Sequence, residues 1–254
     1  MNRLWQVRTK KFSNEKEAIM RSGNVYQIAN GYMGYRGTLD EFGPEQLVGI
    51  TLAGIFDRVG NNWREPVNAP NGGFTEVTLE GVTMSALTTK IKSHRQSLNL
   101  RNAVFERETI FSSGGKNLQL KSSRFLSAAD HHLGVIQFSL TCDQGAKVVI
   151  HTGIDFNIWD LNGPHLLKLA PAKKDGMLLV HGITNEAAKC VAVAETLEFS
   201  PGRETHATNG RKNLHVISLD LEAGKRWRFA ARSRIGCRRS RSSCSRAARS
   251  LIGV

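Results

Sequence analysis

The chain has 254 residues, with 35 Lys and Arg against 22 Asp and Glu, and a formal net charge of +13. Residues 225–254 hold ten of the basic side chains and no acidic one, which leaves 25 basic and 22 acidic side chains, a net charge of +3, for the first 224 residues. Because the excess charge is confined to one end, it gives no reason to class the body as a nucleic-acid-binding protein. The sequence has no N-terminal apolar core of signal-peptide type and no uncharged apolar run of the roughly 18 residues that a membrane helix needs, so no membrane partner is expected.

Residues 24–54, NVYQIANGYMGYRGTLDEFGPEQLVGITLAG, combine closely spaced glycines with aromatic and charged side chains. The glycines at 31, 34 and 37 would each cost about 1 kcal/mol relative to Ala inside a helix. Their spacing favours a strand or loop whose backbone turns sharply or approaches another segment or a ligand. A nucleotide-binding P-loop is disfavoured because the GxxxxGK[ST] pattern and its helix are missing. Two interpretations remain open: a tight β-turn region with aromatic packing, or a loop that faces a sugar through Tyr32, Tyr35 and Arg36.

From Phe74 to Gly224, short segments alternate apolar and polar residues with a period of two, which is typical of half-buried strands. Glycine-containing turn signals lie among them, at residues 71–73, 112–115 and 209–210. Because no amphipathic helix of three turns intervenes, the pattern predicts an all-β fold, a large antiparallel β-sandwich. The segments are residues 77–79, 136–142, 148–150, 177–180, 191–199 and 214–221.

Composition changes abruptly at Lys225, after which Arg, Ser, Ala, Gly and Cys dominate. We predict a sandwich domain over residues 1–224 and a disordered basic tail over residues 225–254 that replaces the last strand. The tail is either an arm that contacts nucleic acid or, the favoured interpretation, an aberrant or frameshifted end, since a GC-rich gene read out of frame yields such a composition. No specific nucleic-acid partner is expected, because arginines without aromatic stacking partners bind nucleic acid unspecifically.

A second polar group lies in GIDFNIWDLNGPHL, where Asp155, Asp160 and His165 surround Trp159. Acidic, amide and aromatic side chains together can bind a sugar, and Asp and Asn equally form turns in sandwich loops. Both interpretations stay open. The neighbouring pair His131–His132 would point to opposite faces of a strand and cannot easily share one metal ion, so no metal site is predicted.

The four cysteines have no metal-site or redox spacing. Cys142 and Cys190 end apolar stretches and are most simply buried free thiols. A reduced, cytoplasmic protein is therefore expected.

The run NGYMGYRGT at residues 30–38, with Glu41 soon after it, resembles the N-terminal domain of glycoside hydrolase family 65. Ala29 and Asn24 depart from the family pattern, which usually has Gly and Glu there, and this affects a local contact rather than the fold. Further matches in the same order extend the resemblance from about Trp5 to Gly224, at residues 51–57, 67–71, 96–100, 124–127 and 153–155.

The resemblance implies a large super-sandwich, galactose-mutarotase-like, of the kind that precedes an α/α barrel in inverting phosphorylases of maltose, kojibiose, nigerose or trehalose. In that family the barrel carries the general-acid Glu and the phosphate site, so no catalytic residue is assigned here and the chain is expected to be a truncated, non-catalytic domain. An α-linked glucose disaccharide as substrate, inorganic phosphate as co-substrate, no cofactor and often a homodimeric state are also implied. The alternative is a stand-alone carbohydrate-binding β-sandwich. The candidate substrate-facing residues are Asn30, Tyr32, Tyr35, Arg36 and Glu41.

Overall fold

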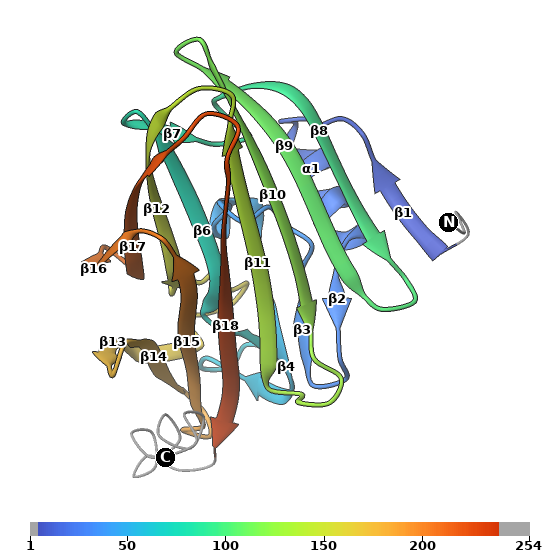
Figure 1. Cartoon of the computed structure of the whole chain (residues 1–254). Helices are drawn as coiled ribbons and strands as arrows, with labels where there is room; N and C mark the ends of the chain where they lie inside the picture. Colours follow the sequence, from blue (N-terminus) through green and yellow to red (C-terminus); the bar gives the residue numbers. More distant parts are fainter. Residues whose placement is uncertain (1–4, 239–254) are drawn as a thin grey trace.

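Long antiparallel strands make up most of residues 5–238, the part of the chain that this computed structural model describes. The largest sheet lies at the front of Figure 1 and has nine strands. In spatial order these are β1 (Gln6–Thr9), β8 (Lys90–Asn99), β9 (Val104–Ser113), β10 (Lys116–Leu126), β11 (Leu133–Cys142), β18 (Arg226–Arg238), β15 (Cys190–Ser200), β14 (Met177–Thr184) and β13 (Leu166–Lys174).

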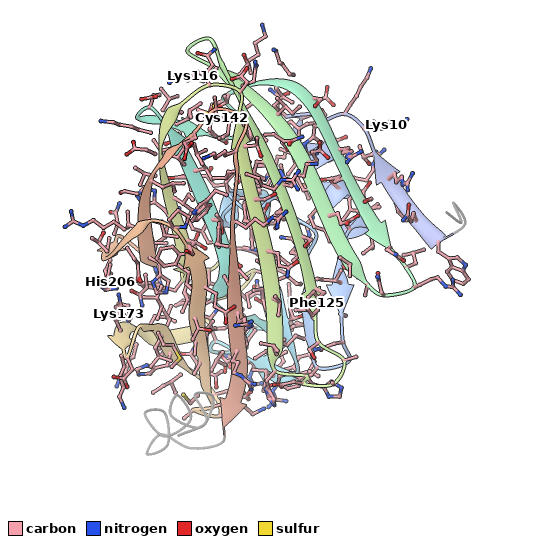
Figure 2. The ribbon with its side chains drawn as sticks, in the orientation of Figure 1. Lys10, Lys116, Phe125, Cys142, Lys173 and His206 are labelled. Atoms are coloured by element: carbon pink, nitrogen blue, oxygen red, sulfur yellow. The ribbon has the colours of Figure 1, made fainter. Side chains whose placement is uncertain are left out.

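Two smaller antiparallel sheets lie behind the large one (Figure 1). Side chains fill the space between the layers (Figure 2), so the all-β sandwich predicted from the alternating pattern is confirmed. The five-stranded sheet has the order β16 (Arg203–Asn209), β17 (Lys212–Leu221), β12 (Ala146–Asp155), β6 (Asn71–Leu79) and β7 (Val82–Met84). The four-stranded sheet has the order β2 (Ile28–Ala29), β3 (Met33–Tyr35), β4 (Ile50–Asp57) and β5 (Glu65–Asn68).

One α-helix, α1 (Lys16–Val25), and a 3-10 turn, η2 (Pro44–Gln46), interrupt the β structure of the described residues. The helix lies behind β8 and β9 in Figure 1 and buries only Ile19 and Gly23. Such a short helix with so little apolar surface carries a weak periodic signal, which is why the sequence pattern did not predict it.

The core between the sheets consists of two apolar clusters with polar side chains at their boundary. Along β15, Val193 belongs to the first cluster and Leu197 packs on the second, while Glu195 lies between them and is fully buried. Along β12, Thr152 occupies the corresponding place between Ile150 and Ile154. Buried polar groups need hydrogen-bond partners. Thr152 has two, the hydroxyl of Thr75 at 2.9 Å and the carbonyl oxygen of Phe74 at 3.2 Å, whereas the Glu195 carboxyl has none.

Strand β18 corrects the predicted domain boundary. The prediction that the sandwich ends at Gly224 and a disordered tail begins at Lys225 is wrong for residues 226–238, which pair with both β11 and β15 in the middle of the nine-stranded sheet. Side chains of this strand alternate strictly: Trp227, Phe229 and Ile235 are buried, and the arginines between them are exposed. The remainder of the predicted tail, residues 239–254, lies outside the described residues.

Two further expectations concern the thiols and the membrane. Cys142 is a buried free thiol, as predicted, but Cys190 is disulfide-bonded, so the prediction of a free thiol there is wrong. The cytoplasmic location, which depended partly on free thiols, stays a prediction. Within residues 5–238, none of the helical structure is both long enough and apolar enough to span a bilayer.

Candidate functional site

The glycine-rich segment begins with a turn between β2 and β3 that Asn30 holds together. Its side-chain oxygen accepts hydrogen bonds from the backbone N–H groups of Tyr32 (3.1 Å) and Met33 (2.8 Å). Its amide donates to the carbonyl oxygens of Ser127 (2.7 Å) and His131 (3.1 Å) in the β10–β11 loop. Gly31 adopts φ = 88°, a left-handed conformation that glycine enters without steric cost. Asn30 therefore fixes the turn and ties it to the large sheet.

Arg36 fastens helix α1 to the 3-10 turn. Its guanidinium donates to the carbonyl oxygens of Met20 (2.7 Å) and Leu47 (2.9 Å) and to the side chain of Asn24 (3.0 Å). A Cβ atom on Gly23 would lie 2.7 Å from the guanidinium carbon, so this arrangement requires glycine at that position. All the nitrogens of Arg36 point at protein acceptors.

The two candidate tyrosines, Tyr32 and Tyr35, lie in different surroundings. Tyr32 is half-buried, with its ring centroid 4.5 Å from that of His132. Tyr35 is buried, donates to Asn71 Oδ1 at 2.9 Å, and lies under the guanidinium of Arg124, 4.5 Å from its ring centroid. Burial raises the pKa of both hydroxyls, so both stay protonated at neutral pH.

Glu41 takes part in a buried ion cluster around Arg107. The Arg107 guanidinium contacts both oxygens of Glu41, one at 2.9 Å, and Asp40 Oδ2 at 3.2 Å. Ser122 donates to the same Asp40 oxygen at 2.8 Å. Burial alone would lower the pKa of Arg107, but the carboxylates of Glu41 and Asp40 outweigh it and raise the pKa, so the arginine stays charged. This pairing makes a charged group tolerable in the core.

The five candidate residues thus occupy three places: Asn30 and Tyr32 beside the β10–β11 loop, Tyr35 and Glu41 in the interior, and Arg36 against α1. Each has a partner within the protein, which is the arrangement expected of a tight turn region with aromatic packing. That they face a substrate stays a prediction.

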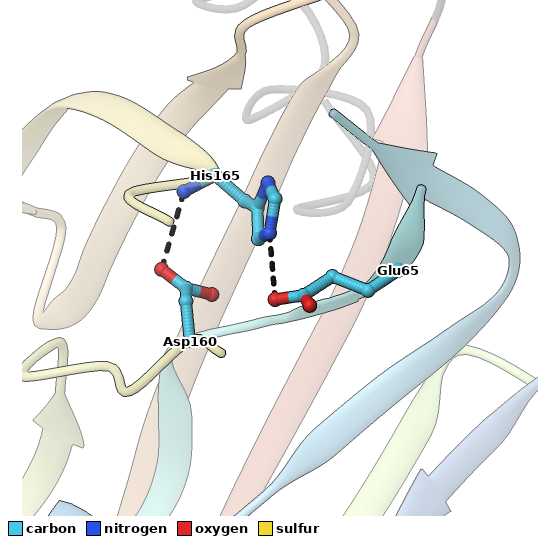
Figure 3. Close-up of side chains that lie close together, drawn as sticks. All are labelled: Glu65, Asp160 and His165. Atoms are coloured by element: carbon cyan, nitrogen blue, oxygen red, sulfur yellow. Dashed lines mark hydrogen bonds and ion pairs between the residues drawn. The ribbon is translucent and has the colours of Figure 1, made fainter. Parts of the chain in front are cut away.

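A group that the sequence analysis only partly recognised surrounds His165 (Figure 3). The imidazole is fully buried, with Nε2 2.7 Å from Glu65 Oε1 and Nδ1 3.1 Å from Asp57 Oδ2. The backbone N–H of His165 donates to Asp160 Oδ2 at 3.1 Å. Burial would lower the pKa of His165, yet the two flanking carboxylates raise it above its usual value. A doubly protonated ring, donating from both nitrogens, is what this geometry suits.

Glu65, Asp160 and His165 place one possible metal-ligand atom each within 4.8 Å of one another. These atoms already bond to each other or to the backbone: His165 Nε2 with Glu65, and Asp160 with the His165 N–H. Glu65 Oε1 also accepts from the N–H groups of Leu161 and Asn162, at 2.9 and 3.2 Å. A metal ion would have to displace hydrogen bonds that now join β4, β5 and the 156–165 loop. The three side chains therefore fit a structural role, holding these segments together, better than a metal site.

Asp155 and Trp159, the other members of the second polar group, also have internal partners. Asp155 accepts from the N–H of Asn157 at 2.9 Å, and Trp159 Nε1 donates to the Val48 carbonyl at 2.6 Å. Burial raises the pKa of Asp155. Of the two interpretations left open, these contacts favour turn formation. Asp57 ends one of the family matches, residues 51–57, but nothing in the sequence linked Asp57 or Glu65 to His165, because both lie about 100 residues from it.

Comparison with known proteins identifies the family. Residues 7–252 match the model of the glycosyl hydrolase family 65 N-terminal domain. The chain belongs to this family. The match runs through residues 226–238, which agrees with their place in the sheet.

Several relatives of this family are phosphorylases. The chain is 40% identical over 205 residues to nigerose phosphorylase of Lachnoclostridium phytofermentans, covering 81% of this chain and 27% of that protein. It is 26% identical over 229 residues to 1,2-alpha-glucosylglycerol phosphorylase of Bacillus selenitireducens, covering 88% and 29%. The solved structure of a candidate kojibiose phosphorylase from the human microbiome superposes with a TM-score of 0.85 at 15% identity, over 98% of this chain and 35% of that one, and supports the fold alone. The chain thus spans under a third of the length of these two curated relatives.

Proposed function

We propose that this chain is the non-catalytic β-sandwich of an enzyme that cleaves an α-glucosidic disaccharide with inorganic phosphate. The observation that carries the proposal is the family match over residues 7–252, together with 40% identity to a nigerose phosphorylase. In inverting phosphorolysis a carboxylic acid protonates the leaving oxygen while phosphate attacks from the opposite face. No cofactor is needed for these two steps.

The carboxylates of the site support a non-catalytic role for the sandwich. Glu41 and Asp40 are paired with Arg107, and Glu65 and Asp57 are paired with His165. A general acid has to reach the leaving oxygen of a substrate with its proton. Carboxylates that are buried and already paired are poorly suited to that task.

Grafting the chain onto a relative tests the proposal. In nigerose phosphorylase of Lachnoclostridium phytofermentans, the matching region would be replaced by residues 7–238 of this chain. We expect the chimera to release glucose 1-phosphate from nigerose and phosphate, and the isolated 254-residue chain to release none. The matched control is the same relative without the region. Turnover by the isolated chain, or a folded chimera without activity, would contradict the proposal.

The substrate and the assembly follow from the same proposal. Nigerose is the first disaccharide to assay because the nigerose phosphorylase is 40% identical to this chain, against 26–29% for the kojibiose and maltose phosphorylases. Kojibiose, maltose and trehalose complete the panel. A homodimer, implied by the family resemblance, would be measured by light scattering of the active chimera.

A further inference from the structure

A cavity of about 330 Å³ lies between helix α1, the loop at residues 10–15 and strand β8. Lys10, in this loop, lies at the β1 edge of the sandwich (Figure 2). The volume falls at the lower end of the roughly 300–1,000 Å³ range of ligand sites. We call it the α1 cavity.

One side of the α1 cavity carries several uncharged polar groups. The Tyr26 hydroxyl lies 2.6 Å from Thr9 Oγ1, and Gln96 donates to Ser22 Oγ. Five lining side chains, those of Thr9, Ser22, Tyr26, His94 and Gln96, thus present hydroxyl, amide and imidazole groups to one space.

The imidazole on this side of the cavity is neutral. His94 Nδ1 lies 2.9 Å from Thr109 Oγ1, which also accepts from Arg107 Nε at 2.9 Å. Burial and the charge of Arg107 lower the pKa of His94 to about 4, so the ring is uncharged at neutral pH.

The rest of the α1 cavity is apolar at depth and balanced in charge at the rim. Phe12 packs against Phe42 and His94, with ring centroids 6.3 and 5.6 Å apart, and Ile19 and Leu39 complete the apolar side. The exposed rim contributes two basic and two acidic side chains: Lys11, Arg21, Glu15 and Glu17. A charged ligand bound inside the cavity would therefore have no side chain of opposite charge beside it.

We propose that the α1 cavity binds a neutral polyhydroxylated molecule of the size of one pyranose ring. Hydroxyls of such a ligand can exchange hydrogen bonds with Tyr26, Gln96 and Ser22, while its C–H faces contact Phe12 and Leu39. A charged ligand would lose its hydration without a compensating partner. The proposal goes beyond the phosphorylase assignment and does not depend on it, because it concerns binding to this chain alone.

Binding of D-glucose to the 254-residue chain, followed by saturation-transfer NMR and thermal shift, tests the proposal. We expect a Kd on the order of 1 mM, typical of a small ligand with few contacts. Glycerol, glucose 1-phosphate and inorganic phosphate should each bind at least tenfold more weakly, the first because it is too small and the other two because they are charged. Absence of glucose binding up to about 50 mM, or equal binding of any of the other three, would overturn the proposal.

Two matched pairs of variants locate the binding. Ala18→Phe places a ring in the cavity, and Met20→Phe places the same ring on the exposed side of the same helix. Gln96→Leu removes the central amide, and Gln137→Leu makes the same change on the exposed face of β11. We expect the first of each pair to weaken glucose binding at least tenfold and the second to leave it unchanged. Since Gln96→Leu can also impair folding, a folded Ala18→Phe variant with unchanged binding is sufficient to refute the proposal.

Discussion

Strands β9 and β18 belong to the same sheet and both carry arginine, but they place it on opposite faces. Arg107 on β9 points into the core, where Asp40 and Glu41 neutralise it. The arginines of β18, among them Arg228 and Arg232, point to solvent from between buried aromatic and aliphatic residues. Successive side chains of a strand point to opposite faces of the sheet. Whether a basic segment can form a strand therefore depends on whether its arginines fall on the solvent-facing positions, and not on how many arginines it contains.

Removing the buried arginine should have the largest effect. We expect Arg107→Met to lower the free energy of unfolding by about 3–5 kcal/mol, because Glu41 would remain buried without a counter-charge and Asp40 would keep only Arg124, 3.7 Å away. Urea denaturation measures this. Arg95→Met, at an exposed arginine paired with Glu108 in the same sheet, is the control and should cost under about 1 kcal/mol. Equal losses in the two variants would show that burial of the Arg107 cluster is unimportant.

His165, Asp57 and Glu65 form a second buried ion cluster, and its contribution to stability depends on pH. We expect His165→Gln to cost about 1–3 kcal/mol at pH 6, since Asp57 and Glu65 lose a charged donor. The pKa of folded His165 is raised, so its contribution is complete below the unfolded value of about 6.5 and is lost as pH rises through the folded value.

Stability of the wild type should therefore fall faster than that of His165→Gln as pH rises above about 6.5. The pKa values of Asp57 and Glu65 are lowered, so their contribution is lost at the acidic end instead. Denaturation midpoints measured from pH 4 to 9 distinguish the two ends. Parallel curves for wild type and variant above pH 6.5 would contradict the assignment of a charged imidazole.

Glu195 sharpens the comparison, because it is buried like Arg107 but unpaired. Burial, with a smaller contribution from Glu204, raises its pKa well above the usual value. A raised pKa makes the folded state hold the proton, so stability is lost as pH rises above about 4.5. We expect Glu195→Gln to stabilise the protein by about 1–2 kcal/mol at pH 8 and to be neutral at pH 4. Thermal melts at both pH values measure this, with Glu106→Gln, at an exposed position, as the control. If Glu195→Gln does not stabilise the protein at pH 8, Glu195 is charged and paired, which would contradict the prediction.

The outward arginines of β18 should matter least. We expect Arg228→Thr to change stability by under about 0.5 kcal/mol, since the side chain is exposed. Phe229→Thr, at the next position, removes a ring stacked on Phe138 at 5.0 Å between centroids and should cost about 3 kcal/mol or more. A reversed order of the two effects would mean that β18 is turned over in the sheet.

The sequence carried enough information for the sandwich but not for its last strand or its buried clusters. Alternation along segments such as residues 136–142 predicted strands correctly, because half-buried strands require it. The same alternation exists in RWRFAARSRI, residues 226–235. The high arginine content of this segment nevertheless led to the prediction of a disordered basic tail. The glycine-rich segment was correctly predicted to contain strand and a sharp turn, which lies between β2 and β3 at Gly31. The partners of Glu41 and Asp57 lie 66 and 108 residues away and have no local signature.

The central position of β18 also bears on how the protein matures during translation. Strands β11 and β15 each present an unpaired edge towards the gap that residues 226–238 fill. Before residues 226–238 have been synthesised, the two halves of the sheet expose strand edges with unpaired backbone groups. Such edges can pair with other chains, so chaperone binding competes with self-association at this stage. Among the described strands of the nine-stranded sheet, the one that joins its two halves is thus the last in chain order.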